Sequence, residues 1–267
     1  MRFCMQSCRE DDTVTEGLIE GRHLSKVYGT ATGPLVALTD VSFTIEEGEF
    51  ISLVGPSGCG KSTLLSILGG LEERSEGSLE LAGGELDRPR ADIGMMFQTS
   101  VLFPWRTVRE NVRLPGIILR LDPKEQAERC DELLDLVGLN GFGDRYPNEL
   151  SGGMRQRVAL ARLLAHGPRV LLMDEPFGAL DEFTRETMNL ELLRIWEKTG
   201  KTVIFVTHNI GESVFLSDRV FVMTPRPGRL AGIVPIDLPR PRETAVMRDP
   251  RYSELVFDIR RMLGVDH

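Results

Sequence analysis

The sequence predicts an α/β fold in which a helical segment interrupts a core of strands and helices. Short apolar runs at residues 50–54, 170–173 and 203–206 are typical of buried parallel strands. Apolar residues with helical spacing over 184–198 separate the last two runs, which gives the order strand, helix, strand. The middle of the chain, roughly 99–165, is rich in helix formers and mixed charge. These observations indicate an α/β core with a helical insertion in its middle.

The remaining elements of the core can be placed in chain order. Alternating apolar and polar residues predict two short strands at 35–38 and 41–45. A helix is expected after the glycine-rich turn that follows residue 54, because four apolar residues share one face: Leu64, Ile67, Leu68 and Leu71. A last pair of strands is expected at 220–223 and 229–234.

Capping residues mark further helix starts. Asp122 followed by Pro123 is a typical first turn, so we expect a helix from there to about residue 136. Ser151 is a favourable N-cap residue and predicts the start of a second helix in the insertion. A short helix is expected near the end of the chain, at about 253–263.

Composition limits the possible functions. Of the 267 residues, 41% are hydrophobic and 27% charged, and the net charge of −8 argues against a protein that coats nucleic acid. No segment approaches the roughly 18 uncharged apolar residues that a membrane-spanning helix needs, and residues 1–16 lack the apolar core of a signal peptide. A membrane role is therefore expected to require a partner. The four cysteines do not form a disulfide pattern: Cys4, Cys8, Cys59 and Cys130.

Residues 55–62 match the phosphate-loop pattern G-x-x-x-x-G-K-[ST] in full, between an apolar strand and an apolar-faced helix. Glycines allow the backbone N–H groups to wrap closely around phosphates. Lys61 would supply positive charge to the β- and γ-phosphates of ATP, and the Ser62 hydroxyl would bind Mg²⁺. The predicted nucleotide-binding residues of this loop are Gly55, Pro56, Ser57, Gly58, Cys59, Gly60, Lys61, Ser62 and Thr63.

Two acidic residues, Asp174 and Glu175, follow the apolar run 170–173. Asp174 at the tip of a buried strand can hold Mg²⁺ through water. Glu175, one residue nearer the γ-phosphate, can orient and deprotonate the attacking water. Apolar strands that end in two acids are common, so this hypothesis depends on the phosphate loop being present in the same chain.

A second helix start suited to anions lies at Ser151, Gly152 and Gly153. Its free N–H groups and the positive end of the helix dipole favour a phosphate, yet the chain's own nucleotide does not need a second cradle. The segment 150–156 resembles the signature motif of ABC ATPases. In that family two subunits pair head to tail, and each signature motif caps the nucleotide held by the other subunit, so the resemblance implies a homodimer.

Other motifs of that family occur at fitting positions. The resemblance implies that Gln98 senses Mg²⁺ and the attacking water, that His208 contacts the γ-phosphate, and that Tyr28 stacks on adenine. Asp181 would lie in the loop that crosses the dimer interface. The resemblance covers about residues 18–234, and ATP and Mg²⁺ are the cofactors it implies.

The resemblance also implies a domain layout. It predicts a P-loop NTPase core of ABC type, with an antiparallel β subdomain and a helical insertion subdomain at about 99–165. We expect residues 1–16 to form a flexible tail, 17–240 the ATPase domain and 241–267 a C-terminal helical tail.

Segments 102–112, 225–229 and 238–242 resemble the ATPases of the nitrate, sulfonate and taurine importer group. In that group the helical insertion docks a transmembrane permease subunit, and a separate substrate-binding protein selects the substrate. The chain is therefore expected at the cytoplasmic face of the cell membrane, as a peripheral subunit. Phe103 and Trp105 are expected to line the docking groove; the alternative is that Trp105 belongs to the core of the insertion.

Two other functions remain open from the sequence. One is a soluble ABC ATPase that acts on DNA or ribosomes, which the single cassette, the absence of a long heptad run and the acidic charge disfavour. The other is the ATPase of an exporter or lipid-extraction system. Asn209 and Ser213 depart from the acidic residue and alanine usual in the importer group, which weakens the match to that subgroup. The resemblance implies that the ATPase does not touch the substrate, so the sequence does not identify it.

Overall fold

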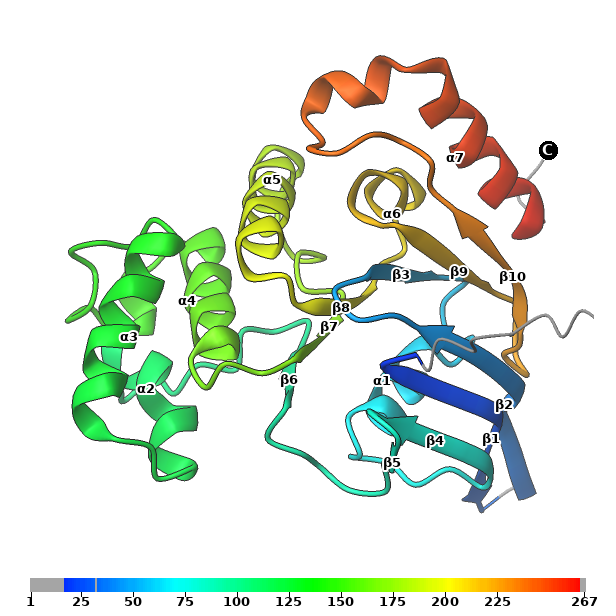
Figure 1. The fold of residues 1–267 in the computed structure, drawn as a ribbon, viewed down its shortest axis with the longest axis horizontal. Coiled ribbons are helices and arrows are strands. Elements are labelled where there is room, and N and C mark those ends of the chain that lie inside the picture. The colour runs from blue at the N-terminus through cyan, green and yellow to red at the C-terminus, as the bar shows by residue number, and fades with distance from the viewer. Residues whose placement is uncertain (1–16, 32, 265–267) are drawn as a thin grey trace, which may run out of the picture.

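The computed structural model describes residues 17–31 and 33–264, which form two β-sheets and a layer of helices at one side (Figure 1). The predicted α/β class with an antiparallel sheet and a helical insertion is confirmed. The predicted tail at 1–16, with Cys4 and Cys8, lies outside the described residues.

The central sheet contains six strands within the described part of the chain, in the order β10-β9-β3-β8-β7-β6. The first five along the chain are mutually parallel, and β10 joins β9 in the antiparallel sense. The strands are β3 (Phe50–Val54), β6 (Ile93–Met96), β7 (Val170–Asp174), β8 (Thr202–Val206), β9 (Arg219–Met223) and β10 (Leu230–Pro235). Every residue of β3 and β8 is buried, as the uninterrupted apolar runs predict for strands covered on both faces.

Two hydrophobic clusters fill the two faces of this sheet. Along β7, Leu171 and Met173 belong to one cluster, and Val170 and Leu172 belong to the other. This division follows from the two-residue repeat of side-chain direction in a strand. In Figure 1, α5 (Glu182–Thr199) and α6 (Ile210–Leu216) cover one face of the sheet and α1 (Lys61–Leu68) covers the other.

The second sheet is antiparallel, in the order β2-β1-β4-β5, and encloses α1 from the opposite side. Its strands are β1 (Ile19–Thr30), β2 (Gly33–Ile45), β4 (Glu76–Leu81) and β5 (Gly84–Glu85). The two short strands expected at 35–38 and 41–45 are wrong as separate elements, because β2 runs through both. An irregularity in its register with β1 lies between them, where Asp40 has a φ of 53°.

The first helix is shorter than its apolar pattern predicts. It ends at Leu68, and Leu71 is 54% exposed instead of buried. The reason is local: Gly69 caps the helix, and Gly70 has a φ of 66° that turns the chain away from the helical path.

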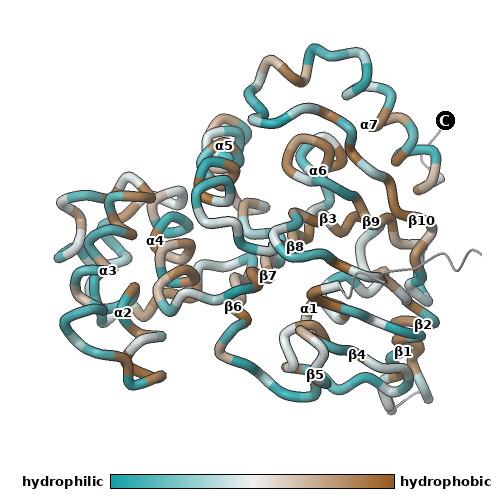
Figure 2. Tube along the Cα trace, viewed as in Figure 1, coloured by the Kyte–Doolittle hydropathy of each residue, from teal (hydrophilic) through white to brown (hydrophobic). Residues whose placement is uncertain are grey.

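The helical layer consists of α2 (Val108–Ile118), α3 (Pro123–Leu136) and α4 (Gly152–Leu164), with a 3₁₀ turn at Pro147–Glu149. The predicted caps are confirmed: Asp122 accepts hydrogen bonds from the first N–H groups of α3, and the Ser151 side chain accepts one from Met154. Hydropathy along the chain is mixed in this layer and more uniformly apolar in the central strands (Figure 2). No helix in the described ranges is long and apolar enough to cross a membrane.

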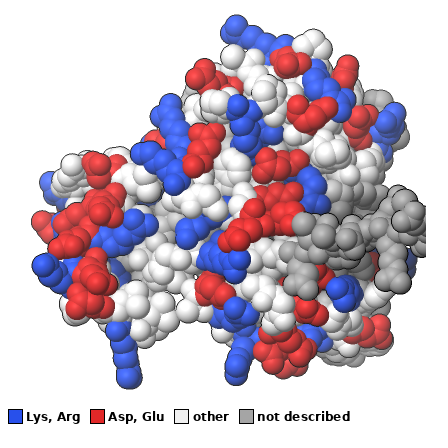
Figure 3. All heavy atoms as spheres, viewed as in Figure 1, with Lys and Arg blue, Asp and Glu red and all other residues white. Residues whose placement is uncertain are grey.

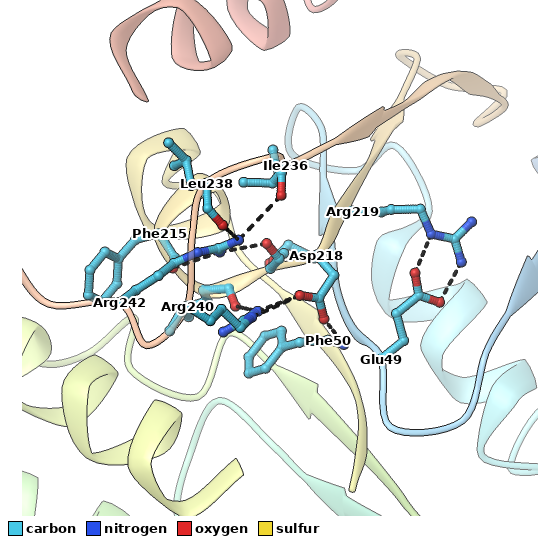
Figure 4. Close-up of polar contacts among 12 residues, drawn as sticks. Glu49, Phe50, Phe215, Asp218, Arg219, Ile236, Leu238, Arg240 and Arg242 are labelled. Carbon is cyan, nitrogen blue, oxygen red and sulfur yellow. Dashed lines mark hydrogen bonds and ion pairs between the residues drawn. The ribbon is translucent and has the colours of Figure 1, made fainter. Parts of the chain in front are cut away.

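The C-terminal segment returns over α6 as a 3₁₀ turn (Thr244–Arg248) and α7 (Pro250–Met262). Its attachment depends on two arginines (Figure 4). Arg240 binds Asp218 and lies 4.0 Å from the ring centroid of Trp196, while the other Asp218 oxygen accepts a hydrogen bond from the N–H of Phe50.

Arg242 is 4% exposed and lies between the tail and the end of α6 (Figure 4). Burial lowers the pKa of its guanidinium to about 10, which still leaves it charged at neutral pH. Its guanidinium donates to backbone carbonyls on both sides of this contact: Val214, Phe215, Ser217, Ile236 and Leu238.

We predict that Arg242→Ala destabilises the protein by about 2–4 kcal/mol, because several buried carbonyl groups lose their donor together. Urea unfolding measures the effect. Arg261→Ala is the control, since Arg261 forms an exposed ion pair with Asp258 on α7 and should change stability by less than about 1 kcal/mol. Equal losses in the two variants would contradict the structural role of Arg242.

Candidate nucleotide-binding and hydrolysis site

A cavity of about 360 Å³ opens where the antiparallel sheet meets the start of α1. The phosphate loop forms its floor, and residues of β1, β2 and two loops form its walls. The lining residues are Tyr28, Leu35, Ala37, Ser57, Gly58, Gly60, Lys61, Ser62, Thr63, Glu175 and Arg226.

The phosphate loop connects β3 to α1 and takes a shape that requires glycine at its end. Gly60 has a φ of 104°, and a Cβ atom there would lie 2.6 Å from the Leu38 side chain. The Lys61 ammonium is 7% exposed and donates to the carbonyls of Gly55 (2.8 Å) and Pro56 (3.2 Å). The N-terminus of α1 therefore faces the cavity with a lysine folded over the loop, an arrangement suited to phosphate.

Three predicted residues of the loop do not line the cavity: Gly55, Pro56 and Cys59. Cys59 is buried among apolar side chains, and burial raises the pKa of its thiol, as expected of a packing residue. Gly55 is also absent from the lining, because it packs against Met223; a Cβ atom on it would lie 3.0 Å from the Met223 Cβ.

Asp174 ends β7 beside the start of α1. The Ser62 hydroxyl donates to its Oδ1 at 3.1 Å. Burial raises the pKa of Asp174, while the Ser62 hydrogen bond and Lys61 act in the opposite direction. Adjacent hard oxygen donors next to a phosphate site match what Mg²⁺ prefers, which is one or two protein ligands completed by phosphate and water. Ser62 and Asp174 therefore fit a Mg²⁺ ion.

Glu175 is the first residue after β7 and has a φ of 44°, which turns its side chain back toward the cavity that it lines. Its N–H donates to Val206 of β8 (3.0 Å), so the strand pairing fixes its backbone. Its Oε2 lies 3.4 Å from Nδ1 of His208, which follows β8. Gln98, after β6, completes the group: its Nε2 and the Glu175 Oε2 both lie 3.6 Å from a Cβ built on Gly178.

Glu212 is a buried residue behind this group that the sequence analysis did not single out. Its carboxylate accepts a hydrogen bond from the Thr207 hydroxyl, and the oxygen of that hydroxyl accepts one from the N–H of Asn209 at 3.0 Å. Asn209 in turn caps α6. Burial raises the pKa of Glu212. This network holds the turn that carries His208. Glu212 lies four residues after His208, at the third position of α6, and this spacing is the sequence signal that could have identified it.

Tyr28 lies on β1 at the wall of the cavity, with the Lys26 ammonium 4.9 Å from its ring centroid. Leu35 and Ala37 of β2 line the same wall and were missed by sequence reasoning. Their two-residue spacing on a strand that pairs with β1 was the signal that could have found them. Arg226 was assigned only to a subgroup motif, yet it too lines the cavity.

The remaining predicted residues lie elsewhere. Ser151, Gly152 and Gly153 begin α4 and do not line the cavity of their own chain. They pack near the start of α5, where a Cβ on Gly153 would lie 2.9 Å from Thr184. Asp181 is exposed and caps α5, and its hydrogen bonds from Thr184 lower its pKa. The two helix starts that the sequence predicts to bind anions therefore do not meet within one chain.

Comparison with known proteins agrees with this arrangement. The family model described as "ABC transporter" matches residues 38–178. The nitrate import ATP-binding protein NrtD of Synechococcus elongatus is 44% identical over 248 residues, which cover 91% of this chain and 90% of that protein. The taurine import ATP-binding protein TauB of Pelagibacter ubique is 48% identical over 210 residues, covering 78% and 79%.

A solved structure also aligns closely. It is a dimeric ATP-binding cassette in a post-hydrolysis state with ADP and Pi, 35% identical, with a TM-score of 0.72 over 82% of this chain and 98% of that one. The resemblance to nitrate and taurine import ATPases is confirmed at the level of sequence. The chain therefore belongs to the ABC transporter family, and it is an ATP-hydrolysing cassette of that family.

Proposed function

We propose that this chain is the ATPase subunit of a membrane importer for a small anion such as nitrate, taurine or an alkanesulfonate. The names of its relatives support the import of such anions. The substrate itself would be selected by a separate binding protein. The chain would act as a homodimer, attached peripherally to a transmembrane permease at the cytoplasmic face of the membrane.

The main support for a dimer is that the two helix starts suited to anions are separate within one chain. The phosphate loop and the Ser151–Gly153 segment lie at different places on one chain, and only the first opens into the cavity. In a head-to-tail pair, Ser151 and Gly153 of one subunit would face the γ-phosphate held by the other. The dimeric state of the aligned cassette supports this assembly. ATP would then join the subunits, and its hydrolysis would release them.

Hydrolysis would use the residues gathered at the strand ends. Glu175 would accept a proton from the attacking water, and the neighbouring His208 would donate a hydrogen bond to the γ-phosphate. Gln98 would orient the same water, and Lys61 would turn from the loop carbonyls to the phosphates. When bound between Ser62, Asp174 and the nucleotide, Mg²⁺ supplies charge neutralisation at the β- and γ-phosphates.

An apolar groove between β6 and the helices α2 and α4 supports a docking role for the helical layer. Its volume is about 400 Å³, and its walls include Phe97, Val101, Phe103, Leu114, Ile118 and Leu119. In Figure 3, mostly uncharged atoms are visible where the helical layer meets the rest of the molecule. The groove has the size and apolar lining that would receive a short amphipathic helix of the permease.

Trp105 is 70% exposed, so the alternative that it is a core residue of the insertion is wrong, but it is not one of the residues that line the groove. Its ring centroid lies 5.2 Å from that of Phe103, which lines the groove. Asn111 is fully buried and binds the backbone of Phe103 and Arg106, so the turn that presents Trp105 is rigid. A large exposed ring on a fixed turn is a typical anchor for a partner.

We predict that Glu175→Gln keeps ATP affinity within about threefold but reduces hydrolysis at least a hundredfold, because the amide cannot accept the proton. The variant should accumulate as an ATP-bound dimer in size-exclusion chromatography. A strain that depends on this chain for uptake of labelled nitrate, taurine or alkanesulfonate should fail to transport with the variant. Normal turnover would show that Glu175 is not the base, and unchanged uptake of all three anions without this chain would refute the import function.

We predict that Trp105→Ala lowers the recovery of the transmembrane subunit in co-purification at least threefold, with ATP binding unchanged. Phe257→Ala is the matched control, since Phe257 is an exposed aromatic residue on α7, in the C-terminal segment. Undiminished recovery with Trp105→Ala would remove this residue from the docking surface. Co-purification with ribosomes or DNA in place of a membrane protein would favour the alternative class of soluble ABC ATPases.

A further inference from the structure

The loop between β9 and β10 is fixed directly beneath the phosphate loop. The N–H of Gly228 donates to the Ala37 carbonyl, and the Gly228 carbonyl accepts from the N–H of Thr39, both at 2.9 Å. Gly228 is buried against the phosphate loop, so closely that a Cβ atom on it would lie 2.0 Å from the Cys59 carbonyl oxygen. The loop therefore has one backbone position relative to both β2 and the phosphate loop.

The tip of this loop is closed by its own hydrogen bonds. The N–H of Thr224 donates to the Arg229 carbonyl at 2.9 Å, and the N–H of Arg229 donates to the Thr224 hydroxyl at 3.0 Å. The same hydroxyl donates to the Pro227 carbonyl at 3.3 Å. The backbone of Arg226 is thus held on a tight, anchored turn.

The Arg226 guanidinium reaches over the phosphate loop into the cavity. Its Nε donates to the Gly58 carbonyl at 3.3 Å, and its Nη2 lies 3.2 Å from the place where a Cβ on Gly58 would stand. Gly58 has a φ of 75° and no side chain, which leaves room for this approach. Arg226 lines the same cavity as Lys61 and Tyr28.

The charge of Arg226 is not neutralised within the described part of the chain, where no carboxylate lies within ion-pair distance of it. Some exposed arginines of the described residues pair with a neighbouring acid, as Arg145 does with Glu149. A guanidinium has five N–H donors, and the contact with Gly58 uses only the Nε donor. The donors on the two Nη atoms remain available at the cavity.

We propose that Arg226 is a nucleotide-binding residue, whose Nη donors bind phosphate oxygens of ATP or ADP from the outer side of the phosphate loop. The planar fork of a guanidinium matches two oxygens of one phosphate, whereas Lys61 supplies a single point charge. The Nε bond to Gly58 would orient the fork. This role rests on the family's nucleotide binding and not on the import function, so it holds whichever partner the ATPase serves.

The test measures the dissociation constant of fluorescent methylanthraniloyl-ADP for the purified chain and for single variants. Arg226→Ala should weaken binding about tenfold, because a charge-assisted contact is lost. The dissociation constant of Arg226→Lys should lie between those of the unaltered chain and Arg226→Ala, since lysine keeps the charge but lacks the planar fork of the guanidinium. Arg229→Ala is the matched control, because Arg229 is an exposed arginine of the same loop that does not line the cavity; it should bind as the unaltered chain does.

Two further measurements separate the loss of a phosphate contact from a loss of folding or of adenine binding. Thermal unfolding without nucleotide should be the same for all variants, because Arg226 is exposed and tied only to one carbonyl. Inorganic tripolyphosphate, which has no adenine, should bind Arg226→Ala about tenfold more weakly when its inhibition constant is measured by displacement of the fluorescent ADP. ADP affinity within twofold of the unaltered chain in Arg226→Ala would overturn the proposal. Weakened ADP binding with unchanged tripolyphosphate affinity would overturn the phosphate assignment.

Discussion

The parallel pairing of β3, β7 and β8 is the constraint on which the site depends. It brings the carboxyl ends of three strands to one edge of the central sheet, so that the phosphate loop, the Asp174–Glu175 pair and His208 become neighbours although they are far apart in sequence. Each strand is buried on both faces, which fixes its register to within a residue. A slip of one residue would reverse the direction of every side chain on the slipped strand.

Hydrogen bonds fix the turns that follow β7 and β8, which the pairing of the strands alone does not fix. Val206 accepts from the N–H of Glu175 and sets the turn after β7, while Glu212, Thr207 and Asn209 set the turn after β8. Farther out, Arg240 and Arg242 bind the tail to the end of α6 and, through Asp218, to the N–H of Phe50 in β3. The C-terminal segment is thus connected to the strand that carries the phosphate loop, through buried hydrogen bonds and not through apolar contact alone.

The phosphate loop and the Ser151 helix start lie at different places on the chain. The phosphate loop opens at the junction of the two sheets, while the Ser151 helix start lies where the helical layer returns to the core beside α5. The helical layer also presents Trp105 and the apolar groove, on a turn fixed by Asn111. A motion of this layer relative to the central sheet would move the Ser151 segment and change the shape of the groove, since the groove lies between β6 of the sheet and α2 and α4 of the layer.

Local physical chemistry allowed the sequence by itself to determine the phosphate loop, the caps at Asp122 and Ser151 and the buried strands, because each depends on neighbouring residues or on a short repeat. The tertiary structure decided which distant residues line the cavity. Leu35, Ala37 and Arg226 reach it through the pairing of β1 with β2 and the anchoring of Gly228, and Glu212 supports the turn that carries His208 through its hydrogen bond with Thr207. It also decided where elements stop: Gly70 ended α1 before Leu71, and Asp40 bent β2 without breaking it. Contacts between segments far apart in sequence set the lining of the cavity, whereas local backbone conformations at Gly70 and Asp40 set the end of α1 and the bend of β2. Apolar periodicity carries no information about either.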